Sequence, residues 1–136
     1  MTTPAEGLRR LRDAAESGLL ETFCVRHGVR VLTVFGSAAR GDERARDLDV
    51  GVLKEREAAF DAVAAVGDLV ELTGVDAIDL AHLNRGGPVL RERALVGSVG
   101  LYESAPGALA DAQAIAIGER IETDPMRRLN LRLLAS

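Results

Sequence analysis

The sequence contains a single cysteine, Cys24, and very few aromatic residues. One cysteine excludes a disulfide within the chain and a zinc site built from cysteines. Its expected role is that of a small apolar residue in the core, on an N-terminal helix. Because aromatic residues make up only 3% of the 136 residues, the core must be built mainly from Ala, Val, Leu and Ile.

Long apolar segments and runs of basic residues are also missing. No apolar stretch approaches the length that crosses a membrane, and the first residues lack the basic and apolar regions of a secretion signal. The net charge is −4, and the basic residues are dispersed, which disfavours nucleic acid as the main partner. We therefore expect a cytoplasmic protein with no membrane attachment.

Hydrophobic periodicity predicts helices that alternate with strands. Residues 4–27 have helical spacing, with a break at Ser17-Gly18 and an end at His27-Gly28. Strands are predicted at 29–35, 47–53, 75–80 and 98–103, and further helices at 55–73, 86–96, 106–122 and 125–134. Since only about a dozen residues join the first two strands, we expect the α+β class. The expected architecture is a mixed central sheet of about four strands with helices packed on one face.

The length fits one domain. We expect N-terminal helices over residues 1–28, a core that carries the chemistry over residues 29–103, and C-terminal helices over residues 104–136.

Two aspartates, Asp47 and Asp49, stand at the start of the second predicted strand. Side chains two apart on a strand point to one face, so these carboxylates project together while Leu48 and Val50 face the core. Two carboxylates this close repel each other unless a cation lies between them. Oxygen ligands without His or Cys suit a hard cation, so the pair predicts a Mg²⁺ site.

A glycine and a serine, Gly36 and Ser37, interrupt the chain where the first strand ends. A turn of this kind that opens a helix presents free backbone N–H groups, which bind phosphate oxygens. The Ser37 hydroxyl adds a donor, and Arg40 is either a further phosphate contact or a solvated side chain. A phosphate-binding turn beside a carboxylate pair predicts metal-assisted nucleotidyl transfer.

The third predicted strand offers a third carboxylate for a two-metal site. Asp76 and Asp79 are three residues apart, so they point to opposite faces of a strand. Parity alone leaves open which of the two joins Asp47 and Asp49.

The ordered set Phe35-Gly36-Ser37-Ala38-Ala39-Arg40-Gly41 and Asp47-Leu48-Asp49 resembles the minimal nucleotidyltransferases of the DNA polymerase β superfamily. The resemblance implies a polymerase β-like fold and a nucleoside triphosphate substrate used with two Mg²⁺ ions. In the family a third carboxylate follows a valine on its strand, which matches Val75-Asp76-Ala77-Ile78 and favours Asp76. Asp47, Asp49 and Asp76 would then hold the metals, while Gly36, Ser37 and Arg40 would contact the nucleotide.

A segment near the end of the chain, Asp124-Pro125-Met126-Arg127-Arg128-Leu129, resembles the tail of MntA-type antitoxins, which pair with HEPN-domain RNase toxins. The resemblance implies that the protein adenylylates a tyrosine of a partner toxin from ATP and so silences it. The oligomeric state stays open, a homo-oligomer included.

Three alternatives remain from the sequence alone. The enzyme could modify a small molecule, although the chain has no room for a separate substrate-binding domain. It could be an antitoxin that acts by binding only, because Arg46 stands where the family has Ser or Thr and could pair with Asp47. It could also be an α+β scaffold without catalysis.

Overall fold

The computed structural model describes residues 2–135, with side chains described for residues 2–122. The helices are α1 (Pro4–Ser17), α2 (Leu19–His27), α3 (Gly36–Ala39), α4 (Ala62–Thr73), α5 (Pro88–Leu95) and α6 (Ala108–Ala135). The strands are β1 (Val29–Phe35), β2 (Leu48–Lys54), β3 (Ile78–His82) and β4 (Val99–Glu103). The side chains of the antitoxin-like segment at 124–129 lie outside the described set.

Local capping explains where the first two helices begin and end. The Thr3 hydroxyl accepts a hydrogen bond from the Glu6 N–H, and the Glu6 carboxylate accepts one from the Thr3 N–H, which caps α1. Gly18, at φ +90°, separates α1 from α2, and Gly28, at φ +66°, ends α2. The predicted break and the predicted end are both confirmed.

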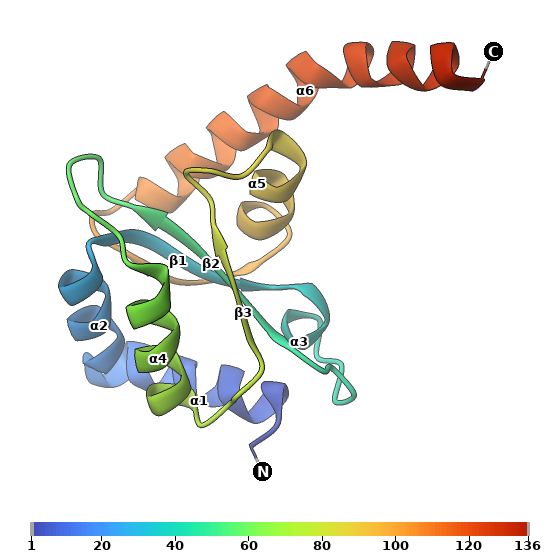
Figure 1. The fold of residues 1–136 in the computed structure, drawn as a ribbon. Helices are drawn as coiled ribbons and strands as arrows, with labels where there is room; N and C mark the ends of the chain where they lie inside the picture. Colours follow the sequence, from blue (N-terminus) through green and yellow to red (C-terminus); the bar gives the residue numbers. More distant parts are fainter. Residues whose placement is uncertain (1, 136) are drawn as a thin grey trace.

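The four strands form one mixed sheet in the order β3-β2-β1-β4. Strand β1 runs antiparallel to β2 and to β4, whereas β2 and β3 are parallel and are connected through α4. This arrangement confirms the α+β class and the mixed sheet. It also brings the end of β1 and the starts of β2 and β3 to one end of the sheet (Figure 1).

Helices cover both faces of the sheet, so the prediction of helices on one face was wrong (Figure 1). Leu32 and Val34 pack with α1, α2 and α4 on one face, and Val31 and Phe35 pack with α5 and α6 on the other. The apolar run of β1 is buried on both sides, which is typical of a strand between two layers. The short link between the first two strands gave no information about this second layer.

Three predicted element boundaries also need correction. Helix α4 begins at Ala62, not near residue 55, because the Asp61 carboxylate caps it by accepting a hydrogen bond from the Ala64 N–H. Strand β3 begins at Ile78, so residues 75–77 belong to the loop that precedes it. The two predicted C-terminal helices form one continuous helix, α6.

Cys24 is fully buried in the core, as the sequence predicted, and burial raises the pKa of its thiol well above the usual value. Within the part of the chain that the structure describes, no helix is both long and apolar enough to span a bilayer.

Candidate active site

The end of β1 and the starts of β2 and β3 meet at the end of the sheet next to α3 (Figure 1), and several of the polar residues singled out from the sequence lie there. Asp49, near the start of β2, is paired with Phe35 at the end of β1 and with Asp79 on β3. Across the sheet, the order is therefore the turn at Gly36 after Phe35, for which phosphate binding is predicted, then Asp49, then Asp79.

The turn at Gly36 lies directly against the Asp49 carboxylate. Gly36 has φ +74°, a conformation that favours glycine, and a Cβ at this position would collide with the Asp49 Oδ2 atom. Because Gly36, Ser37 and Ala38 open helix α3, their backbone N–H groups have no acceptor inside the helix. Backbone donors and a carboxylate thus lie side by side, as a metal–phosphate site requires.

Three carboxylates interact electrostatically at this point. The pKa of Asp49 is raised, first by partial burial, then by the charge of Asp79 and a hydrogen bond with it, and then by the charge of Asp47. The positive charge of Arg93 acts in the opposite direction. Asp79 is therefore a neighbour of Asp49, and Asp47, in the bend just before β2, adds a third negative charge.

Asp76, the predicted third carboxylate, is not part of this group. It lies in the loop before β3, where its carbonyl accepts a hydrogen bond from the Ile78 N–H at 3.1 Å. Its side chain lines a separate pocket of about 440 Å³ with Thr2, Thr3 and Arg46, beside the start of α1. Because β3 begins later than predicted, the structure places Asp79, and not Asp76, beside Asp49.

Three arginines, Arg40, Arg44 and Arg46, lie between β1 and β2, and all three are exposed. Arg46 lines the pocket with Asp76, and no ion pair between it and Asp47 is seen among residues 2–122. The predicted competition of Arg46 for Asp47 is therefore not seen. Arg40 ends α3, with its backbone N–H 3.2 Å from the Ser37 carbonyl and 3.3 Å from that of Gly36. Its contact with phosphate stays a prediction.

Arg93, on α5, is a residue that the sequence reasoning missed. Its guanidinium lies 5.9 Å from the centre of the Phe35 ring, and its charge acts on Asp49. No spacing or motif marks Arg93 among the other arginines of the chain. Only the packing of α5 on β1 brings it to the site.

The side chains at this site fit a hard divalent cation. Asp47, Asp49 and Asp79 offer carboxylate oxygens only, and the turn at Gly36 leaves no bulk between them and a bound phosphate. Within the residues whose side chains are described, no three Asp, Glu, His or Cys side chains lie close enough to one another to form a metal site. A cation would draw Asp47 towards the carboxylates of Asp49 and Asp79, which are directly paired across β2 and β3.

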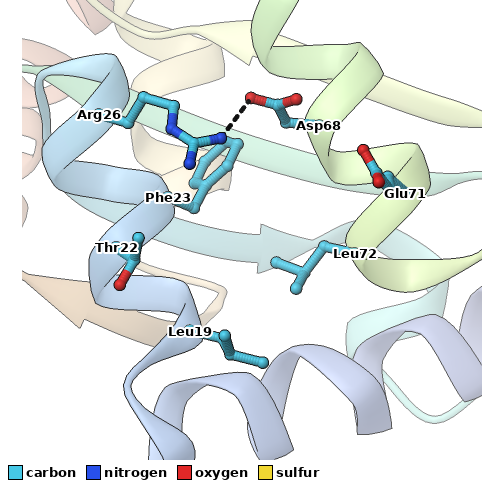
Figure 2. Close-up of a pocket in the computed structure, with 7 residues that line it drawn as sticks. All are labelled: Leu19, Thr22, Phe23, Arg26, Asp68, Glu71 and Leu72. Carbon is cyan, nitrogen blue, oxygen red and sulfur yellow. Dashed lines mark ion pairs between the residues drawn. The ribbon is translucent and has the colours of Figure 1, made fainter.

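A different pocket, of about 360 Å³, lies between α2 and α4 (Figure 2). Figure 2 shows Arg26 of α2 facing Asp68 of α4, with Arg26 Nη1 3.6 Å from Asp68 Oδ2. The same Asp68 oxygen lies 2.6 Å from His27 Nε2. These contacts join the two helices, and none of the candidate active-site residues lines this pocket.

One family of known proteins matches most of the chain. The family model described as "Polymerase beta, Nucleotidyltransferase" matches residues 19–106, which include Gly36, Asp47, Asp49 and Asp79. A search of curated protein sequences found no match.

Solved structures with a similar fold come from toxin–antitoxin complexes. A chain of a toxin–antitoxin structure with AMP-PNP has a TM-score of 0.70 at 15% identity, over 86% of this chain and 96% of that one. A chain of a complex between a tri-AMPylated HEPN toxin of Shewanella oneidensis and an MNT antitoxin has a TM-score of 0.67 at 15% identity, over 92% and 99%. A chain of a mutant MntA–HpeT complex has a TM-score of 0.70 at 14% identity, over 88% and 98%. At such identities the likeness concerns the fold.

Proposed function

Because the chain belongs to the polymerase β nucleotidyltransferase family, we propose that it transfers a nucleoside monophosphate from a nucleoside triphosphate to a hydroxyl acceptor. One observation carries this proposal: Asp49 lies between the glycine turn at Gly36 and the Asp79 carboxylate of the next strand. That arrangement holds the groups that bind phosphate and the groups that bind cations at one place.

The metal ligands in this proposal are Asp47, Asp49 and Asp79. Two bound Mg²⁺ ions would offset the negative charge that builds on the attacking and leaving oxygens. Gly36 and Ser37 orient the triphosphate through backbone N–H groups at the start of α3. The protein contributes to this reaction mainly by positioning the phosphates and stabilising their charge.

The reaction proceeds at the α-phosphorus. The acceptor oxygen forms a bond to it, the bond to the β-phosphate oxygen breaks, and pyrophosphate leaves. Asp79 lies on β3, the strand at the edge of the sheet, where an acceptor can approach. We assign to its carboxylate the proton of the acceptor hydroxyl, a role for which an ionised carboxylate suffices.

We further propose that the donor is ATP and the acceptor is a tyrosine of a HEPN-domain toxin. Support comes from similar folds in solved structures, one with AMP-PNP and one with an AMPylated HEPN toxin bound to an MNT antitoxin. A phenol is a suitable acceptor because its hydroxyl, with a pKa near 10, needs only a nearby carboxylate or cation to lose its proton. In this proposal adenylylation silences the toxin.

Mass spectrometry of the partner tests the function. The purified chain is incubated with ATP, Mg²⁺ and a HEPN-domain protein as the candidate partner, in parallel with the Asp49→Asn variant. We expect one or more tyrosines of the partner to gain AMP with the wild type and none with the variant. A wild-type chain that binds its partner tightly but leaves it unmodified would instead identify an antitoxin that acts by binding alone.

A further inference from the structure

Helix α5 is fixed tightly to the sheet beside the candidate active site. The buried Thr33 hydroxyl of β1 donates a hydrogen bond of 2.6 Å to the Ala94 carbonyl. A Cβ placed on Gly51 would lie 3.2 Å from the Ala94 Cβ, so the helix approaches β2 closely. Ala94 is completely buried, and the backbone of Arg93 next to it is therefore held in a defined place.

The Arg93 side chain extends from α5 over the end of β1. Its guanidinium carbon lies 5.9 Å from the centre of the Phe35 ring, a cation–π arrangement that keeps the charge above this residue. Phe35 directly precedes Gly36, so the guanidinium lies on the β1 side of Asp49. Among the residues whose side chains the structure describes, the Arg93 guanidinium makes no hydrogen bond or ion pair.

A nearby arginine of α5 is engaged elsewhere. Arg91 binds the Glu119 carboxylate of α6 and donates to the carbonyl oxygens of Leu83 and Gly86. Its guanidinium thus joins α5 to α6 and to the loop before α5. Arg93, in contrast, keeps its N–H donors for a ligand, and a planar guanidinium is well suited to phosphate oxygens.

The order of groups across the sheet indicates which phosphates Arg93 would meet. Displacement at phosphorus places the attacking and leaving oxygens roughly in line, on opposite sides of the phosphorus atom. Asp79, the proposed proton acceptor, lies on the β3 side of Asp49, while Phe35, Gly36 and Arg93 lie on the β1 side. The leaving pyrophosphate then departs on the side where the positive charge of Arg93 is.

We propose that Arg93 binds the β- and γ-phosphates of the nucleotide and stabilises the pyrophosphate as it leaves. This inference rests on the proposed nucleotidyl transfer and adds to it the residue that distinguishes a triphosphate from a monophosphate. AMP has neither of the phosphates that Arg93 contacts, so its binding does not depend on this side chain.

Calorimetry with two nucleotides tests this role. Binding of a non-reacting ATP analogue and of AMP, both with Mg²⁺, is measured for the wild type, Arg93→Ala and Arg93→Lys. Arg12→Ala serves as the control because Arg12 is exposed on α1, away from the site. We expect Arg93→Ala to weaken binding of the ATP analogue by about tenfold or more, with binding of AMP unchanged. Lys at this position keeps the charge and should restore part of the affinity.

The outcomes separate the two proposals. Wild-type binding of the ATP analogue combined with unchanged binding by Arg93→Ala would overturn the role of Arg93 and leave the proposed function standing. Equal losses for the ATP analogue and for AMP would also overturn it, since they indicate a general disturbance of the site. A wild-type chain that binds neither nucleotide with Mg²⁺ would overturn the proposed function itself.

Discussion

At the scale of the residue, Gly36 combines an unusual backbone conformation with a close approach to charge. Its φ of +74° strains any residue with a Cβ, and that Cβ would collide with Asp49. Gly18 has φ +90° but open space around it, so a substitution there carries only the cost of the backbone conformation, with no collision. We expect Gly18→Ala to lower the free energy of unfolding by about 1–2 kcal/mol and Gly36→Ala to lower it further.

Denaturant unfolding of both variants measures this difference, and nucleotide binding measures its effect on the site. Gly36→Ala should also lose binding of ATP with Mg²⁺, whereas Gly18→Ala should keep it. Equal destabilisation by the two substitutions would show that the contact between Gly36 and Asp49 is loose.

The third carboxylate allows a second comparison between two residues of one short segment. Asp79 is paired with Asp49 across β2 and β3, whereas Asp76 lies in the preceding loop beside α1. We expect Asp79→Asn to abolish nucleotidyl transfer because it removes a metal ligand and the proton acceptor. Asp76→Asn should retain transfer within about twofold, as for surface substitutions away from a site. Transfer rates with a saturating partner decide the assignment, and the reverse pattern would return the role to Asp76.

The raised pKa of Asp49 predicts how stability depends on pH without metal. Partial burial and the charges of Asp79 and Asp47 raise this pKa, so the folded protein holds the Asp49 proton more tightly than the unfolded chain does. Ionised Asp49 therefore costs stability above its folded pKa, and this cost disappears as the pH falls through that value. We expect Asp49→Asn to melt higher than the wild type at neutral pH in EDTA, with the gap closing in acid.

Thermal melting across the acid range, with both proteins in the same buffers, measures that gap. The charge of Arg93 partly offsets the repulsion, so the direction of the change is the test. A gap that widens as the pH falls would mean that the carboxylates do not interact as described.

At the scale of the element, one buried hydroxyl joins α5 to the sheet. Thr33 lies at 0% exposure, and its hydroxyl donates to the Ala94 carbonyl at 2.6 Å. Thr33→Val keeps the shape but removes the donor, and we expect it to lower the free energy of unfolding by about 2 kcal/mol. Thr22, on α2, makes a similar bond to the Gly18 carbonyl but is exposed, so Thr22→Val should change stability by no more than about 0.5 kcal/mol. Urea unfolding of both variants compares them.

Elements with strong local signals could be predicted from the sequence. Strand β1 has the predicted bounds, Val29–Phe35, because a β-branched run ends at a glycine. The ends of α1 and α2 were equally clear, because Gly18 and Gly28 stand there and adopt left-handed conformations. Helix α4 and strand β3 begin later than predicted, since the Asp61 cap and the pairing of Ile78 with Leu48 set these boundaries. The start of β3 is set by its pairing with β2, and the hydrophobic pattern of one strand gives no information about that pairing.

The same limit applies to the site. Asp49 could be placed near the start of β2 because strand periodicity is local, whereas Asp47 lies in the bend before that strand. The choice between Asp76 and Asp79 depended on the register between β2 and β3, which pairs Asp49 with Asp79. Arg93 depended on the way α5 packs over β1, where Phe35 meets its guanidinium. Both of these residues are brought to the site by contacts that are distant in the sequence.

At the scale of the whole molecule, the acidic group predicts a specific form of ligand stabilisation. With a net charge of −4 and three carboxylates at the site, ATP alone should be repelled, whereas ATP with Mg²⁺ should bind. At a ligand concentration of about 100 times the dissociation constant, binding stabilises the folded state by about 2.7 kcal/mol. We expect ATP with Mg²⁺ to raise the melting temperature by several degrees and ATP with EDTA to leave it unchanged. Equal shifts under the two conditions would contradict a metal-dependent site.

The position of β3 at the edge of the sheet has a consequence for the timing of catalysis. Asp79 is on a strand with β2 as its sheet neighbour in the order β3-β2-β1-β4, whereas Asp49 lies on an interior strand. An edge strand opens more readily than an interior one, so the amide protons of β3 should exchange with solvent faster than those of β1 and β2. In the proposed function, Asp49 and Asp79 would both hold the metal, and metal and nucleotide would then keep β3 in place. Hydrogen–deuterium exchange should therefore slow at residues 78–82 when the nucleotide binds. The acceptor would then bind next to a strand that the nucleotide has already stabilised.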